Sequence, residues 1–278
     1  MQCLSCGRIL AQPLGRGRRR KFCNPACKMR HQRGTLAPVR APRTQARPDG
    51  PVVPALHHGR FEDYAQAYRG QIDVVIVDPP YTRAALPLYA PLLAFVQTVL
   101  VEGGYFLCMP GSTFFDQVVS QCAASALEFV AVIEYRLGGL RRRQNRQHTS
   151  TGTRTWQTRH KSVLWYEQPG RRRDGIHGRH PYKRLPGGID VIDATGDFAQ
   201  DRYPDQQSLA GFQALVSRFT TRQDVILDPM CGWGTTLIAA LTQHRPHVIG
   251  IEKDRARYDY ACEQVALAQA QREAYQRP

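Results

Sequence analysis

The sequence predicts an α/β protein built on a doubly wound, mainly parallel sheet. Short apolar runs alternate with longer stretches of helical composition over residues 56–278. Two of these runs end in turns of unusual composition, at 78–81 and 228–234. Because parallel strands end at one edge of a sheet, both turns are expected at that edge.

Each predicted element follows from local composition. Residues 72–77 form a β-branched run that predicts a buried parallel strand, and 105–109 predict the next strand after a Glu-Gly-Gly turn. Further strands are predicted at 126–135, 161–166, 224–227 and 247–251. Residues 235–244 predict the helix between the last two strands, and the Ala- and Gln-rich stretch 257–275 predicts a closing helix.

The chain is expected to contain a small N-terminal unit at 1–34, a linker at 35–55 and a main domain at 56–278. Five prolines and little apolar periodicity mark the linker. With 278 residues, of which 42% are hydrophobic, the chain can bury one full core and carry a small appendage. No apolar stretch reaches the roughly 18 residues of a membrane span, and no apolar leader opens the chain, so we expect an intracellular protein with reduced thiols.

Positive charge is concentrated in two segments. Residues 1–48 hold twelve Lys and Arg and no acid, and residues 136–173 hold eleven with one acid, Glu167. These segments supply +12 and +10 of a formal net charge of +15, so the rest of the chain is net acidic. Two basic blocks on an acidic body predict surfaces for a polyanion, most simply nucleic acid. A solvated basic tail is the alternative for residues 40–47.

Four cysteines near the N-terminus have the spacing of a zinc site. Cys3 and Cys6 form one close pair, and Cys23 and Cys27 form a second pair after sixteen intervening residues. Zn²⁺ takes four such ligands in a tetrahedron, and so short a unit needs a metal to fold. We therefore predict a structural Zn²⁺ site, four unrelated thiols being the alternative. The second pair, preceded by Phe and followed by Lys, resembles small bacterial zinc-ribbon modules.

The turn at 228–234 has the composition of a cofactor loop. Its glycines, Gly232 and Gly234, let the backbone approach a ligand closely, and a threonine is expected to cap the helix that opens at Thr235 or Thr236. Glu252 ends the next predicted strand, where a carboxylate can accept hydrogen bonds from both hydroxyls of a ribose. The turn is therefore expected to bind a cofactor that contains a nucleoside. From these residues, a nicotinamide cofactor is one alternative for its identity.

The turn at 78–81, Asp-Pro-Pro-Tyr, resembles the catalytic loop of enzymes that act on a base amine, and the chemistry explains its residue types. The Asp78 carboxylate and the Pro79 carbonyl can accept hydrogen bonds from the exocyclic NH₂ of adenine or cytosine, which localises and aims its lone pair. Pro79 and Pro80 stiffen the loop, and Tyr81 offers a flat face for a base flipped out of a duplex. An ordinary Asp-Pro turn after a strand is the alternative.

Together the two turns resemble the catalytic and S-adenosylmethionine (SAM) loops of the DNA amino-methyltransferases. Their order along the chain matches the permuted (β) class, and the resemblance covers about residues 56–270, including the pairs His58-Gly59 and Gln207-Ser208. It implies a Rossmann-like SAM-dependent methyltransferase fold, with Asp78, Pro79, Pro80 and Tyr81 as the catalytic loop. The residues that it implies for SAM binding are Asp228, Met230, Gly232, Gly234, Thr235 and Glu252. The family commonly has Phe at the position of Met230, and a smaller residue at that of Trp233.

In this family the segment between the two loops reads the DNA target, which places a target-recognition region at about 136–202. Its basic residues are expected to contact DNA, mostly through phosphates. They are Arg141, Arg142, Arg143, Arg146, Arg154, Arg159 and Lys161. An exposed basic loop that adds only salt-dependent affinity is the alternative.

The resemblance implies methylation of adenine N6 in double-stranded DNA, because Asp-Pro-Pro-Tyr is usual among adenine enzymes. Cytosine N4 of DNA and an RNA base remain alternative targets. C5-cytosine chemistry is set aside because the chain has no Pro-Cys nucleophile motif. The rival of another class is a zinc-dependent DNA-binding protein with an inactive methylase fold. A bacterial or phage-encoded enzyme of this family is expected in the cytoplasm, associated with the nucleoid.

Overall fold

The computed structural model describes residues 54–137, 143–149, 152–158, 160–170, 191–194 and 207–276. The chain divides into two units, at 1–50 and 51–278, and all described residues belong to the second. Cys3, Cys6, Cys23 and Cys27, and almost all of the proline-rich linker, lie outside the described residues. None of the helices in the described ranges is long and apolar enough to cross a membrane.

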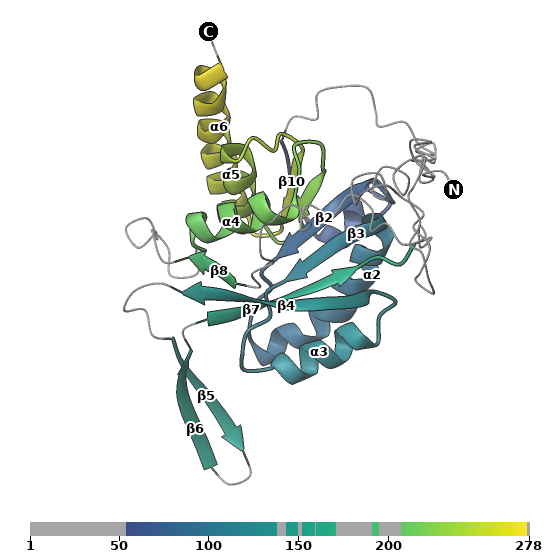
Figure 1. The fold of residues 1–278 in the computed structure, drawn as a ribbon, viewed down its shortest axis with the longest axis vertical. Helices are drawn as coiled ribbons and strands as arrows, with labels where there is room; N and C mark the ends of the chain where they lie inside the picture. The colour runs from purple at the N-terminus through teal and green to yellow at the C-terminus, as the bar shows by residue number, and fades with distance from the viewer. Residues whose placement is uncertain are drawn as a thin grey trace, which may run out of the picture. The chain divides into compact units, whose positions relative to one another are not determined.

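One large sheet organises the second unit (Figure 1). Among the described residues its strands are β1 (Ala55–His58), β2 (Ile72–Val77), β3 (Leu100–Cys108), β4 (Glu128–Leu137), β7 (His160–Glu167), β8 (Val191–Ala194), β9 (Ile226–Asp228) and β10 (Val248–Glu252). They lie in the order β1-β10-β9-β2-β3-β7-β4-β8. Neighbours pair in parallel except where β7 meets β3 and β4, to both of which it is antiparallel.

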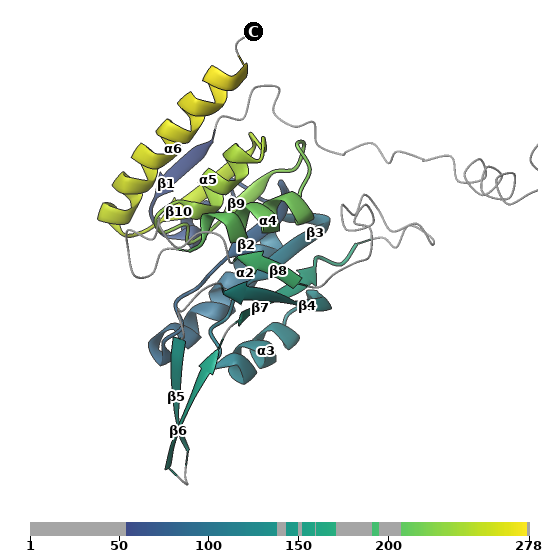
Figure 2. The ribbon, with the colours of Figure 1, turned by 60° about the vertical axis from the view of Figure 1, so that its left-hand side comes forward.

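Helices cover both faces of this sheet (Figure 2). On one face lie α4 (Leu209–Phe219), α5 (Thr235–Thr242) and α6 (Arg255–Gln276), whose buried residues join one apolar cluster. On the other face lie η1 (Phe61–Tyr64), η2 (Arg83–Leu88), α2 (Tyr89–Val99) and α3 (Phe115–Ala123), which join a second cluster. Coverage of both faces explains why β2 is β-branched and apolar almost throughout instead of alternating with polar residues.

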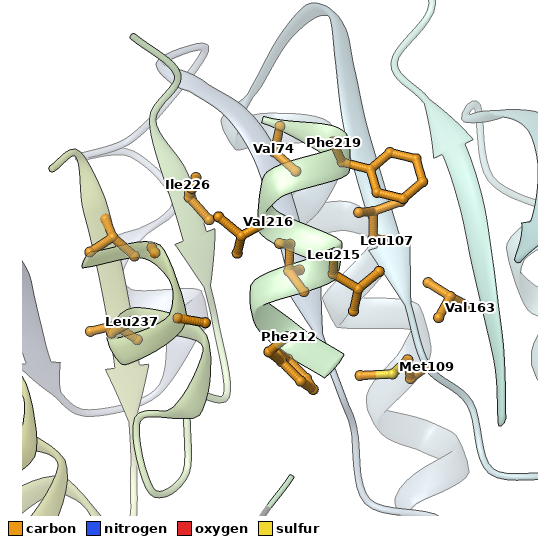
Figure 3. Packing of buried hydrophobic residues seen from close by; sticks show 14 of the residues in the cluster. Val74, Leu107, Met109, Val163, Phe212, Leu215, Val216, Phe219, Ile226 and Leu237 are labelled. Atoms are coloured by element: carbon orange, nitrogen blue, oxygen red, sulfur yellow. The ribbon is translucent and has the colours of Figure 1, made fainter. Parts of the chain in front are cut away.

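The packing beneath α4 shows this burial directly (Figure 3). Phe212, Leu215, Val216 and Phe219 line one side of α4 and meet the sheet. The sheet residues opposite them include Val74, Leu107, Val163 and Ile226, each from a different strand. The pattern in α4, with apolar side chains three and four residues apart, is that of a helix with one buried face.

The strand order reverses direction between β9 and β2. The chain leaves β9 through α5 to reach β10 on one side, and leaves β2 through η2 and α2 to reach β3 on the other. In such sheets the crevice at the carboxyl ends of the two central strands is where ligands bind. The turns at 78–81 and 228–234 follow β2 and β9, so both predicted loops lie at this crevice.

The predicted strands and helices are confirmed in the described residues, with shifts at their ends. The strand predicted at 105–109 begins earlier, at Leu100, and the closing helix runs from Arg255. The sequence did not predict β1, β8 or a separate hairpin of β5 (Arg143–Thr149) and β6 (Gly152–Thr158). These strands are short or polar, so they lack the apolar run on which the predictions depended.

Gly211 permits the close approach of α4 to β4 and β8. A Cβ at this position would lie 1.8 Å from the Tyr135 hydroxyl and 2.8 Å from Cβ of Ala194. Tyr135 is 0% exposed, so its ring has little room to move away. The same helix begins after Ser208, whose side chain accepts a hydrogen bond from the Gly211 amide at 3.1 Å.

We predict that Gly211→Ala destabilises the protein although alanine favours helices by about 1 kcal/mol over glycine. Overpacking against Tyr135 and Ala194 should cost about 1–3 kcal/mol of unfolding free energy, measured by urea denaturation. The matched control is Ser217→Ala, at an exposed position of the same helix, which should leave the midpoint almost unchanged. A Gly211→Ala protein as stable as the Ser217→Ala protein would contradict the packing argument.

Candidate active site

The loop after β9 is built on two glycines with left-handed backbone conformations. Gly232 has φ +52° with nothing within 4 Å of a Cβ position, and Gly234 has φ +83°. A side chain at Gly234 would also meet Cβ of Ala261 at 3.1 Å. Gly234 is the residue that caps α5, which begins at Thr235. The predicted helix start is confirmed, whereas the expected threonine cap is wrong.

Asp228 anchors this loop from the end of β9. It is 4% exposed and accepts hydrogen bonds from the Thr236 hydroxyl and, at 3.1 Å, from the Met230 amide. Burial raises the pKa of Asp228 to about 7, against the effect of these two hydrogen bonds, and the nearby charges of Asp78 and Glu252 add to the rise. Thr236 therefore supports the anchor instead of capping the helix.

Glu252 ties the loop to the next strand. Glu252 is 7% exposed, and its carboxylate accepts hydrogen bonds of 2.8 Å from the Gly232 amide and 2.8 Å from the Asp254 amide. A carboxylate has about four lone-pair sites, so acceptor capacity remains for a ligand hydroxyl. The position at the end of β10 agrees with the position expected for a ribose-binding acid.

Trp233 packs onto α6. Its ring meets Tyr260 edge-on at 5.3 Å between centroids, and the Arg257 guanidinium lies 5.4 Å from the indole centroid. Local sequence could not predict the direction of this bulky side chain, because α6 lies after the next strand. The contact fixes the outer part of the 228–234 loop against the helix.

The loop after β2 gathers a second set of polar groups. The Tyr81 hydroxyl donates a hydrogen bond to Asp78 Oδ1. Lys161 Nζ lies 3.0 Å from the Tyr81 hydroxyl, 2.6 Å from Gln207 Oε1 and 3.6 Å from Asp78 Oδ2. Pro79 is buried and Pro80 is exposed, so only the first proline packs into the protein.

A small pocket opens beside Tyr81. Its lining is mostly apolar and includes the rings of Tyr89 and Phe114. Gly111, which follows β3, also lines it, and a Cβ there would lie 2.5 Å from Cβ and Cγ of Tyr81. The position of the Tyr81 ring therefore depends on glycine at 111.

The structure brings the two sets of predicted residues to one crevice. Asp78 and Tyr81 lie at the end of β2, and the residues of the 228–234 loop lie at the end of the adjoining β9. The sequence missed Lys161 and Gln207 as partners of Asp78 and Tyr81, and it missed Gly111. Nothing in the local sequence could reveal these contacts, because each joins segments that are remote in the chain.

The residues predicted to contact DNA fall into three groups: those on the hairpin strands β5 and β6, those outside the described residues, and Lys161. Arg143 and Arg146 belong to β5 and Arg154 belongs to β6. Arg141, Arg142 and Arg159 lie outside the described residues. Lys161 was predicted with this group, but the structure places its side chain at Asp78, with 10% exposure.

Four cysteines lie among the described residues, and one of them, Cys231, belongs to the 228–234 loop. Cys108, Cys122 and Cys231 are buried, as expected of packing residues, and Cys262 is partly buried. In the part of the chain that the structure describes, no group of three or more His, Cys, Asp or Glu residues is arranged to hold a metal ion.

The raised pKa of Asp228 predicts a pH-dependent stability. The native carboxyl has a pKa of about 7, whereas an unfolded aspartate has about 3.9. Between these values the native state binds more protons than the unfolded state, so the unfolding free energy falls as pH rises through this window. Asp228→Asn removes the titration, and the stability of wild type relative to the variant should fall by a few kcal/mol from about pH 4 to about pH 7. Urea denaturation at several pH values measures this difference; parallel pH curves for the two proteins would refute it.

Comparisons with known proteins agree with this geometry. A family model for N6 and N4 methyltransferases, described as DNA methylase, matches residues 72–263. A search of curated proteins finds none that matches the chain. Among solved structures, TTHA0409 of Thermus thermophilus, assigned as a DNA modification methylase and complexed with SAM, shares 21% identity at a TM-score of 0.58, over 78% of this chain and 94% of that chain.

Two further solved structures have the same fold. The M1.HpyAVI–SAM complex shares 19% identity at a TM-score of 0.56, over 76% of this chain and 98% of that chain. PvuII DNA methyltransferase, which is cytosine-N4-specific, shares 10% identity at a TM-score of 0.59, over 79% of this chain and 92% of that chain. The structural likeness supports the fold, and the family model covers most of the chain from β2 to α6. The chain therefore belongs to the N6/N4 family of DNA methylases.

Proposed function

We propose that this protein transfers a methyl group from SAM to the N6 amine of adenine in double-stranded DNA. The observation that carries the proposal is the meeting of two loops at one crevice. Asp78 and Tyr81 at the end of β2 lie beside the Asp228 loop at the end of β9. One loop suits an amine, and the other suits a nucleoside cofactor.

The second loop fits SAM by the chemistry of its groups. Glu252 keeps acceptor capacity for ribose hydroxyls, and the open space around Gly232 lets a ligand approach the backbone. Asp228, Met230, Gly234 and Thr235 complete the proposed binding set. When bound, SAM supplies an electrophilic methyl on a positively charged sulfonium. Asp228 and Glu252 lie close enough to influence each other, and an incoming cation favours the ionised form of the buried Asp228 carboxyl.

Asp78 is the proposed acceptor for the target amine, with the Pro79 carbonyl as its partner. A carboxylate that accepts from the NH₂ localises its lone pair and directs it, which raises its nucleophilicity. In the present arrangement the Tyr81 hydroxyl holds Asp78 Oδ1. An incoming base must therefore displace this contact, and the Tyr81 ring then stacks on the base. A base in a duplex has to leave the stack to be reached.

Adenine is preferred over cytosine because Asp78 opens an Asp-Pro-Pro-Tyr motif, the form that the sequence resemblance associates with N6 enzymes. The order of the loops along the chain supports the permuted class. The hairpin β5–β6 lies in the proposed target-recognition region and carries Arg143, Arg146 and Arg154. Cytosine N4 is the second candidate, favoured by the fold shared with the cytosine-N4-specific PvuII enzyme.

We predict labelled methyl transfer from SAM to mixed-sequence duplex DNA, with N6-methyladenine found by nucleoside analysis. Asp78→Ala should lower the rate at least about 100-fold, because it removes the acceptor for the amine. The matched control is Asp63→Ala, an exposed aspartate in η1, which should keep the wild-type rate.

The product distinguishes the alternatives. N4-methylcytosine would move the target to cytosine while keeping the role of Asp78. SAM binding without transfer to duplex, single-stranded DNA or RNA would favour the rival, a DNA-binding protein with an inactive methylase fold.

We further propose that Cys3, Cys6, Cys23 and Cys27 hold one structural Zn²⁺ and that the 1–34 unit adds DNA affinity. The support is the paired spacing and the preference of Zn²⁺ for four thiolates. These residues lie outside the described ones, so the proposal rests on sequence.

Elemental analysis of the purified protein should find about one zinc per chain, as expected of four thiolate ligands. The double variant Cys23→Ser with Cys27→Ser should lose the metal, and Cys262→Ser in α6 should retain it. Loss of zinc should also weaken DNA binding and leave SAM binding intact. Equal zinc content in the double variant and in Cys262→Ser would exclude this site.

A further inference from the structure

Lys161 reaches the catalytic crevice because β7 is antiparallel to its neighbours, β3 and β4. Leu164 pairs with Cys108, the last residue of β3, so Lys161 lies beyond the end of that strand. The antiparallel direction therefore puts the start of β7 at the edge where β2 and β9 end (Figure 1). In the sheet Lys161 pairs with Tyr135, on the face that α4 covers.

The ammonium group of Lys161 is surrounded by acceptors of this site. It has three N–H donors, and Gln207 Oε1 and the Tyr81 hydroxyl oxygen lie within hydrogen-bond distance, at 2.6 and 3.0 Å. Asp78 Oδ2 forms an ion pair with it at 3.6 Å, and the Tyr81 ring centroid lies 5.2 Å away. Both charged side chains are largely buried, at 10% exposure for Lys161 and 13% for Asp78.

This environment differs from that of a phosphate-binding lysine. A lysine that contacts DNA phosphates keeps its ammonium accessible to solvent and exchanges counterions on binding. Lys161 instead has its charge directed inward at a carboxylate. Because a neighbouring cation favours the ionised form of a carboxylate and restrains its orientation, Lys161 can act on the reaction through Asp78.

We propose that Lys161 is a positioning residue of the active site: it keeps Asp78 ionised and oriented toward the target amine, and Gln207 holds Lys161 in place. This inference rests on the proposed methyl transfer. Gln207 contributes from the segment just before α4, so the positioning set spans β2, β7 and the α4 start. Asp78 remains the residue that touches the base, and Lys161 acts behind it.

The test is the single-turnover rate of methyl transfer as a function of pH, at saturating SAM and DNA. Lys161→Met should slow transfer about 10–100-fold, because a misplaced group in a positioned site loses rate of this order. The acid limb of the pH–rate profile of Lys161→Met should move to higher pH by about 1 unit or more, because the Asp78 carboxylate loses the adjacent cation. Lys161→Arg, which keeps the charge, should retain the wild-type acid limb and part of the rate.

Matched variants separate this role from others. Arg222→Met removes an exposed cation from the turn between α4 and β9, at the opposite edge of the sheet, and should behave as wild type. Gln207→Leu removes the hydrogen bond between the Gln207 amide and Lys161 and should give a smaller change in the same direction. It also keeps the test valid if Lys161→Met does not fold. SAM affinity should not fall in any variant, since none of these residues belongs to the 228–234 loop.

The outcomes distinguish the two levels of proposal. No methyl transfer by wild type would overturn the proposed function and with it this inference. Transfer by wild type, with Lys161→Met and Gln207→Leu both unchanged in rate and acid limb, would overturn the positioning role alone. So would a Lys161→Met protein whose only defect is weaker DNA binding with a salt dependence reduced by about one phosphate contact.

Discussion

The pairing of β2 with β9 is the constraint on which the site depends. Val74 lies opposite Ile226 and Val75 opposite Leu227, so two segments remote in the chain become the central strands of the sheet. Burial on both faces enforces this pairing, because neither strand has a polar side to expose. The crossovers then leave in opposite directions, and the space above the strand ends stays open for Asp78 and the 228–234 loop.

Local patterns predicted the parts of the site that one segment encodes. The β-branched run at 72–77 and the glycines of the 228–234 loop each carry their own signal, and Glu252 was predicted from its place at the end of the next strand. Contacts between remote segments carried no such signal. The basic neighbours of Lys161 in the sequence predict a DNA contact, whereas its position beyond the end of β3 places it beside Asp78. The threonine cap failed because Gly234 already supplies the backbone conformation that ends the turn.

The crevice holds a group of carboxylates, whereas segments 1–48 and 136–173 of the chain are strongly basic. Asp78, Asp228 and Glu252 come together on the acidic body, and the first two are buried enough to influence each other. The ammonium of Lys161 lies on the Asp78 side, whereas a hydroxyl and an amide hold Asp228. Two carboxylates of one crevice thus have two electrostatic settings: Asp78 is paired with a cation, whereas burial raises the pKa of Asp228.

The antiparallel direction of β7 lets the segment between β4 and β7 vary without a change in the sheet. The preceding strand β4 ends, and β7 begins, at the same edge of the sheet as the crevice. The chain between them is therefore an insertion whose two ends are fixed by the sheet. Its described strands, β5 and β6, form a separate two-stranded sheet. Such an insertion can be lengthened, shortened or exchanged for another without altering the register of any core strand. The sheet can thus keep one chemistry while different insertions between β4 and β7 bind different partners.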